Sequence, residues 1–202
     1  MDEGQVVKVL NQKVGKQLDP FEHARKRPTN YIGTIKTERH PKKVVVSSDT
    51  GDSFEDRVIS YNQGLERIFI EILSNAKDNY WESEKGGAKM TFIKVLYKDG
   101  QITVENDGLP IPVIKHPYQI TTHEGKKITQ EAYPAEKFFG NMNFGTNFDK
   151  DKEKKISSGL NGMGGKLANI FSDSFEVNIL DAYNKQQFYQ KYTEAGKKKG
   201  KP

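Results

Sequence analysis

A glycine-rich stretch restricts the fold more than any other part of the chain: Gly159-Leu160-Asn161-Gly162-Met163-Gly164-Gly165-Lys166. Glycine has no Cβ, so backbone N–H groups in such a stretch can turn toward a bound anion at close range. The apolar residues between Leu167 and Phe171 predict a helix directly afterwards, and the N-terminal end of a helix favours negative charge. Lys166 adds a positive charge. The stretch therefore predicts a phosphate-binding loop that leads into a helix.

Glycine spacing alone does not identify the class of nucleotide-binding fold. Leu167 follows Lys166 where a Walker A loop requires Ser or Thr. The spacing also differs from the G-x-G-x-x-G of dinucleotide-binding folds. A flexible loop before a helix is the alternative interpretation, and two further segments decide between the two.

The first of these segments, residues 71–79, lies in a run with the apolar spacing of a helix. Glu71, Asn75 and Asp78 fall at i, i+4 and i+7, so they share one helix face. A solvated face is the simplest interpretation, but asparagine is a poor helix former. A carboxylate one turn from an amide suits phosphoryl chemistry, in which Glu71 polarises a water and the Asn75 amide oxygen binds Mg²⁺.

The second segment, residues 106–112, follows a predicted β-hairpin formed by residues 90–97 and 101–105. In the second strand, Ile102, Val104 and Asn106 point toward the same apolar face. A buried amide needs a polar partner, and a purine edge would serve. The alternative is an ordinary strand-ending turn, which Asn-Asp-Gly also encodes.

In this order and spacing, the three segments resemble the GHKL ATPase superfamily. Within it, the chain resembles the N-terminal ATPase domain of type IIA DNA topoisomerases, eukaryotic or viral type. The resemblance covers roughly residues 16–190, and its other anchors are Phe21-Glu22-His23, Arg27-Pro28, Tyr31-Ile32-Gly33, Gly145-Thr146-Asn147 and Asn169-Ile170-Phe171-Ser172.

Alternating helices and hairpins, together with this resemblance, predict an α+β Bergerat fold. We expect a two-layer sandwich of a mixed, largely antiparallel sheet with helices on one face. The resemblance implies binding of ATP and Mg²⁺, with Glu71 as catalytic base and Asn75 as metal ligand. It also implies nucleotide contacts from Asn75, Asp78, Asn79, Asn106, Gly108, Gly145, Thr146, Asn147, Gly159, Asn161, Gly162, Met163, Gly164, Gly165 and Lys166.

Three features depart from the family pattern. Pro110 replaces the second glycine of the family's G-x-G-I-P and removes one N–H. Gly15 stands where the N-terminal arm of the family offers a tyrosine to the partner subunit. The chain also stops before the transducer domain, whose lysine reaches the γ-phosphate, and it lacks the DNA-cleaving tyrosine. We therefore expect a fragment of a larger type II topoisomerase, which uses ATP to drive DNA strand passage.

The composition fits an intracellular protein. The 202 residues include no cysteine, which excludes a disulfide framework and thiol catalysis. No membrane-spanning run and no signal peptide are evident. His116 and His123 lack the spacing of zinc ligands. We expect a nuclear protein if the source is a eukaryotic cell, and one of the host cytoplasm or virion if it is viral.

We expect an N-terminal arm at residues 1–16, an ATP-binding domain at 17–195 with a lid at about 140–166, and a disordered basic tail at 196–202. Val44 to Val46 predict a short strand before a polar loop, whereas residues 113–135 give no clear element. The expected partners are ATP, DNA through the full-length enzyme, and a second copy in a nucleotide-dependent homodimer, with no membrane.

Two alternatives stay open: a histidine-kinase-type GHKL catalytic domain, and a basic nucleic-acid-binding module. The net charge of +5 is modest, and 27 acidic residues are interleaved with the basic ones, which argues against the second.

Overall fold

The computed structural model describes residues 18–121, 125–141 and 163–202. The helices are α2 (Pro20–Lys26), α3 (Gln63–Lys85), α4 (Pro134–Gly140) and α5 (Gly164–Ile170), with a 3₁₀ turn η1 (Pro28–Asn30). The strands are β1 (Thr37–Ser48), β2 (Gly51–Asn62), β3 (Ile93–Lys98), β4 (Gln101–Asn106), β5 (His116–Thr121), β6 (Lys127–Ala132), β7 (Ser174–Asp181), β8 (Gln186–Thr193) and β9 (Lys198–Lys199).

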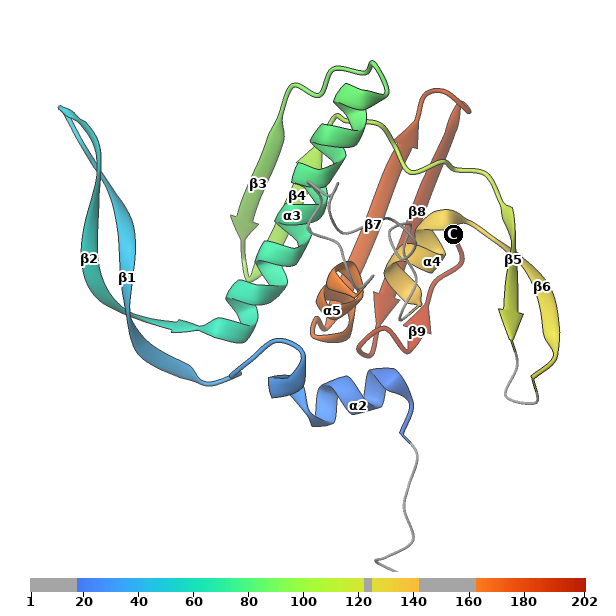
Figure 1. Cartoon of the computed structure of the whole chain (residues 1–202), viewed down its shortest axis with the longest axis horizontal. Coiled ribbons are helices and arrows are strands. Elements are labelled where there is room, and N and C mark those ends of the chain that lie inside the picture. Colours follow the sequence, from blue (N-terminus) through green and yellow to red (C-terminus); the bar gives the residue numbers. More distant parts are fainter. Residues whose placement is uncertain (1–17, 122–124, 142–162) are drawn as a thin grey trace, which may run out of the picture.

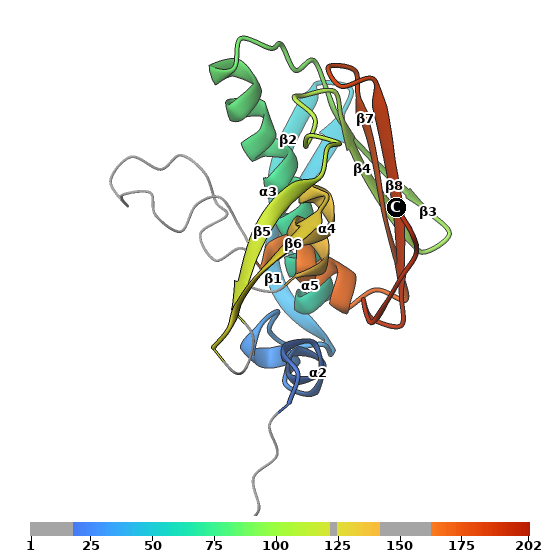
Figure 2. The ribbon, with the colours of Figure 1, turned by 90° about the vertical axis from the view of Figure 1, so that its right-hand side faces the viewer.

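The body of the molecule has two layers. Figures 1 and 2 show α3, α4 and α5 on one side and the hairpins β3–β4 and β7–β8 on the other. This confirms the predicted α+β class and layering. The strands do not form the single mixed sheet that was expected. Those of the described residues form four separate antiparallel sheets. Most of these ladders join strands that are consecutive in the chain and linked by a short turn, such as Asp99-Gly100 with positive φ at both residues.

The long helix α3 begins and ends where local chemistry requires. The side chain of Asn62 accepts a hydrogen bond from the Leu65 N–H at 3.0 Å, which caps the first turn. Gly86 follows the last helical residue. Ala76 and Ser83 are buried and face the body. The helix predicted to carry Glu71 and Asn75 is therefore confirmed. No helix in the described part of the chain is both long and apolar enough to cross a membrane.

A compact apolar core fixes the position of α5. Its buried members are Val113, Ala135, Val177, Phe188 and Tyr192. Next to them, α5 is buried from its second residue to its last. Each large apolar side chain that is withdrawn from water contributes about 1.5–3 kcal/mol. Because α5 is held in this way, its glycine-rich first turn has a defined place against α3.

Two regions differ from expectation. The predicted short strand at Val44 to Val46 belongs to a hairpin of two 12-residue strands, β1 and β2, which projects from the body (Figure 1). The basic tail was expected to be disordered, but Lys198 and Lys199 form β9 and pair with β8. The Lys199 ammonium also lies 3.1 Å from the Glu136 carboxylate, so both backbone and side-chain contacts hold this part of the tail.

Candidate nucleotide site

The predicted catalytic and metal-binding residues lie where α3 meets the first turn of α5. A Cβ at Gly164 would overlap the Oε2 atom of Glu71 and lie 3.2 Å from its Cβ. A Cβ at Gly165 would lie 3.0 Å from the Phe139 ring and 3.6 Å from the Asn75 Nδ2 atom. Glycine therefore permits the close approach of α5 to α3. The structure brings Glu71, Asn75, Gly164 and Gly165 together, as the sequence predicted.

The Glu71 carboxylate is held by a residue that the sequence analysis did not single out. Its Oε1 atom lies 2.5 Å from the Arg67 guanidinium, one helical turn earlier. Glu71 is half-buried, whereas Arg67 and Asn75 are exposed. The i, i+4 spacing of an arginine and a glutamate was the available signal for this pair. The Asn75 amide is thus accessible to a ligand beside an oriented carboxylate.

A second group of predicted residues joins α3 to the end of β4. Asn79 Nδ2 donates to Asn106 Oδ1 at 2.8 Å, and the Gly108 N–H donates to the same oxygen at 3.1 Å. The amide oxygen of Asn106 therefore has partners within the chain, where the sequence suggested a purine edge. Asp78, the neighbour of Asn79, is half-buried on the same helix.

Space around Gly108 is restricted. A Cβ there would lie 2.7 Å from both Asn79 Nδ2 and Ser83 Oγ. Ser83 is fully buried, and its hydroxyl oxygen accepts a hydrogen bond from the Leu109 N–H at 2.8 Å. Sequence reasoning missed Ser83, which lies one turn beyond Asn79. It fixes the segment that follows β4, including the unusual Pro110, against α3.

Asp107 has a structural task at this junction. Its carboxylate accepts hydrogen bonds from Thr91 Oγ1 at 2.5 Å and from the N–H groups of Thr91 and Phe92 at 2.8 and 3.1 Å. These bonds, led by the one from the Thr91 hydroxyl, lower the pKa of Asp107. The end of β4 is thereby tied to the start of β3.

Lys166 lies inside the protein rather than on its surface. Only 2% of the residue is exposed, and burial lowers its pKa to about 8. Met163 directly precedes α5 as its N-cap residue and is half-buried. A phosphate contact by Lys166 or Met163 stays a prediction. Six other predicted residues lie outside the described ranges: Gly145, Thr146, Asn147, Gly159, Asn161 and Gly162, together with most of the expected lid.

The donor set fits Mg²⁺ bound mainly through a nucleotide. No group of three or more His, Cys, Asp or Glu residues that could hold a metal occurs in the described ranges. Magnesium commonly uses one or two protein oxygens and completes its octahedron with phosphate and water oxygens. The exposed amide of Asn75 can supply one such oxygen. Glycine at positions 164 and 165 lets α5 approach Glu71 and Asn75 closely.

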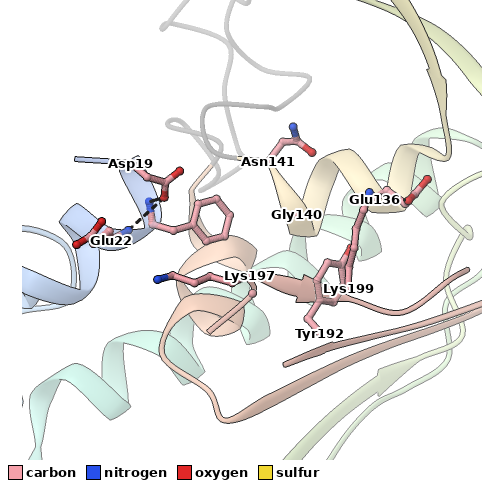
Figure 3. A pocket seen from close by; sticks show the side chains of 10 residues that line it. Asp19, Glu22, Glu136, Gly140, Asn141, Tyr192, Lys197 and Lys199 are labelled. Atoms are coloured by element: carbon pink, nitrogen blue, oxygen red, sulfur yellow. Dashed lines mark hydrogen bonds and ion pairs between the residues drawn. The ribbon is translucent and has the colours of Figure 1, made fainter. Parts of the chain in front are cut away.

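A separate hollow lies between α2, the C-terminal end of α4 and the segment that joins β8 to β9 (Figure 3). Its volume is about 440 Å³, and its lining includes Asp19, Phe21, Tyr192 and Lys197. None of the predicted site residues within the described ranges lines it. The α3–α5 junction, and not this hollow, is therefore the candidate site.

Comparison with known proteins points to one class of enzyme. The chain is 34% identical over 187 residues to DNA topoisomerase 2 of Penicillium chrysogenum. This alignment covers 92% of the chain and 11% of that protein. It is 38% identical over 178 residues to a probable DNA topoisomerase 2 of Dictyostelium discoideum, covering 87% and 10%. The chain thus spans about a tenth of the length of these curated relatives. No family model matches it.

A solved structure agrees with these relatives. The crystal structure of the ATPase region of Saccharomyces cerevisiae topoisomerase II matches with a TM-score of 0.76 and 31% sequence identity. The match covers 93% of this chain and 46% of that one. The similarity therefore extends over sequence and fold, and over nearly all of this chain.

Proposed function

We propose that this chain binds ATP with Mg²⁺ and hydrolyses ATP, because it is homologous over most of its length to the ATPase region of type II DNA topoisomerases. The observation that carries the proposal is the α3–α5 junction. There the Glu71 carboxylate and the Asn75 amide lie on one face of α3, beside the glycine-rich first turn of α5. Glycines at that turn offer backbone N–H groups to phosphate oxygens.

Glu71 is the proton acceptor in this proposal. A water oxygen attacks the γ-phosphorus of ATP, its proton passes to the Glu71 carboxylate, and the bond from the γ-phosphorus to the β,γ-bridging oxygen breaks to give ADP and phosphate. Asn75 supplies the protein oxygen for Mg²⁺. Bound Mg²⁺ offsets negative charge on the phosphates. Gly164 and Gly165 let α5 pack directly against the side chains of Glu71 and Asn75.

The remaining residues of the site divide into two groups by position. Asn106 and Gly108, fixed by Asn79, would meet the nucleoside at the end of β4. Asp78 completes the polar face of α3 at this end. Toward the phosphates we assign Met163 and Lys166, together with Gly159, Asn161 and Gly162 of the preceding stretch. Gly145, Thr146 and Asn147 would contact the ribose and phosphates.

The activity of a whole enzyme is a further part of the proposal. We infer that the domain at residues 17–195 serves a type II DNA topoisomerase, in which ATP binding and hydrolysis drive DNA strand passage by a nucleotide-dependent homodimer. In such an enzyme other segments supply the γ-phosphate lysine and the DNA-cleaving tyrosine. The expected location is the nucleus for a cellular eukaryotic source. A histidine-kinase domain and a nucleic-acid-binding module find no support among the relatives.

Glu71→Gln tests the proposal most directly. A general base contributes about 10²- to 10⁴-fold, so phosphate release should fall to about 1% or less of that of the unmodified chain. Binding of a Mg·ATP analogue, measured by calorimetry, should be largely retained. Glu66→Gln is the matched control, because Glu66 lies on the same helix and pairs with Lys42 at 2.8 Å.

Asn75→Ala separates the metal role from the base role. It should weaken binding of the Mg·ATP analogue while leaving Mg²⁺-free binding nearly unchanged. Normal turnover in Glu71→Gln would remove Glu71 from the mechanism. Absence of any nucleotide binding by the unmodified chain would refute the proposal as a whole.

A further inference from the structure

We propose that Arg67 is a positioning residue for ATP hydrolysis, which holds the Glu71 carboxylate toward the first turn of α5. This inference rests on the proposed ATPase function. One carboxylate oxygen, Oε1, lies 2.5 Å from the Arg67 guanidinium. The other, Oε2, faces Gly164 so closely that a Cβ there would overlap it. The two oxygens thus have different surroundings: one is held, and the other is directed at the turn assigned to the phosphates.

Stabilisation of the helix does not account for this pair. An exposed i, i+4 ion pair contributes only about 0.3–0.5 kcal/mol to a helix. The favourable order places the acid N-terminal to the base. The Glu22–Lys26 pair in α2 has that order. Arg67 and Glu71 have the reverse order, so their contact does little for α3 as a helix.

Within the described residues, the charged side chains nearest in sequence to this pair are engaged elsewhere. Glu66, the acid next to Arg67 in the chain, is engaged by Lys42 of β1 at 2.8 Å. The charged side chain of α5, Lys166, is buried. Arg67 is 58% exposed at its side chain while Glu71 is only 21% exposed, so the guanidinium reaches inward from the solvent side to the carboxylate.

The contact has a consequence for catalysis. A glutamate side chain has three rotatable bonds, and a proton acceptor works only if its lone pair meets the attacking water at hydrogen-bond distance. Misplacement by about 1 Å can lower a rate by about 10²-fold. By holding Oε1, Arg67 restricts the carboxylate to orientations in which Oε2 faces α5. Loss of Arg67 should therefore lower turnover and leave nucleotide affinity nearly unchanged.

The experiment compares Arg67→Ala and Arg67→Lys with Arg57→Ala. Arg57 is a matched control on β2, where its exposed guanidinium lies 2.8 Å from the Glu55 carboxylate. We expect Arg67→Ala to lower kcat for ATP about 10- to 100-fold, with the Kd for a Mg·ATP analogue changed less than about twofold. Arg67→Lys should recover part of the rate, and Arg57→Ala should match the unmodified chain.

A second measurement does not depend on activity. In ¹⁵N-labelled chain without nucleotide, the Nη2–H₂ group of Arg67, which contacts Glu71, should give a more ordered NMR signal than that of an unpaired arginine. Glu71→Gln should release it, and Glu66→Gln should not. An Arg67→Ala variant with normal kcat would overturn the inference, as would an Arg67 signal insensitive to Glu71→Gln.

Failure of the proposed function gives a different pattern. If the unmodified chain binds no nucleotide or releases no phosphate, the proposed function fails and this inference fails with it. If the unmodified chain is active and Glu71→Gln is not, but Arg67→Ala behaves like Arg57→Ala, only the role of Arg67 is refuted. A fall in affinity equal to the fall in kcat would assign Arg67 to nucleotide binding and would also overturn the positioning role.

Discussion

The α3–α5 junction and the β1–β2 hairpin use the same kinds of residue in opposite ways. At the junction, Gly164 is required because the Glu71 side chain fills the space beside it. In the hairpin, Gly51 has open space around it and a φ of +121°. Lys166 is buried in α5, whereas Lys43 of the hairpin is exposed beside Asp56. At the junction, side-chain packing therefore decides which residues are tolerated. In the hairpin, backbone conformation decides it.

This contrast indicates where substitutions act on the whole molecule. A side chain at the junction touches the core, the helix layer and the candidate site together. The hairpin projects from the body, and the apolar side chains of Val45, Phe54 and Val58 are mostly exposed. Changes at the junction should alter stability and nucleotide binding at once. Equivalent changes in the hairpin should have little effect on stability or nucleotide binding, because the altered side chains face solvent.

The largest expected effect concerns the two lysines. The pKa of Lys166 is lowered by burial from 10.5 to about 8 in the folded chain. Below pH 8 the protein bears the full cost of burying the charged lysine. Between pH 8 and 10.5 the unfolded chain binds the proton more tightly, so stability rises with pH. We expect Lys166→Met to be more stable at pH 7, by up to about 3 kcal/mol, and to lose that advantage toward pH 10.5.

Urea unfolding at a series of pH values measures this difference. Lys43→Met is the control, because Lys43 lies on the exposed hairpin and its loss should leave the pH dependence of the unmodified chain in place. Parallel stability curves for Lys166→Met and the unmodified chain between pH 8 and 10.5 would contradict the buried placement of Lys166. The two regions would then not differ in the burial of a charged lysine.

The sequence predicted the junction well because short-range rules govern its parts. The i, i+4 and i+7 spacing placed Glu71, Asn75 and Asp78 on one helix face. Glycine spacing and family resemblance linked α5 to α3. Fold class and layers followed from the alternation of helices and hairpins.

The missed features depend on contacts between distant residues. The partner of Asn106 is Asn79, 27 residues away, and Ser83 meets Leu109 across a similar separation. Burial of Lys166 depends on the packing around α5, which its own sequence does not disclose. The length of β1–β2 was underestimated because its strands carry charges on both faces and lack apolar alternation.

An intermediate effect is expected for Gly164→Ala. The added Cβ overlaps the Glu71 carboxylate, and overpacking of this kind costs about 1–3 kcal/mol. Nucleotide binding should weaken as well, because Glu71 or α5 must shift. In a Glu71→Ala background the carboxylate is gone, so the cost of Gly164→Ala should fall. Gly51→Ala, strained only by its own backbone, should cost the same in both backgrounds. Equal costs of Gly164→Ala in both backgrounds would contradict the packing described here.

The smallest expected effect separates two serines. Ser83 is fully buried, and its hydroxyl oxygen is the acceptor for the Leu109 N–H at 2.8 Å. Ser83→Ala leaves that N–H without its partner in a place that water does not reach, which costs about 1–2 kcal/mol. Ser48 of the hairpin donates to the Gly51 carbonyl at 2.9 Å, but Ser48 is exposed. Water replaces this bond in Ser48→Ala, so stability should change by less than about 0.5 kcal/mol.

Urea unfolding of both variants at pH 7 gives the comparison. Because Ser83 fixes the segment after Gly108, Ser83→Ala should also weaken binding of the Mg·ATP analogue, while Ser48→Ala should not. If the two variants lost equal stability, burial would not be what distinguishes the junction from the hairpin.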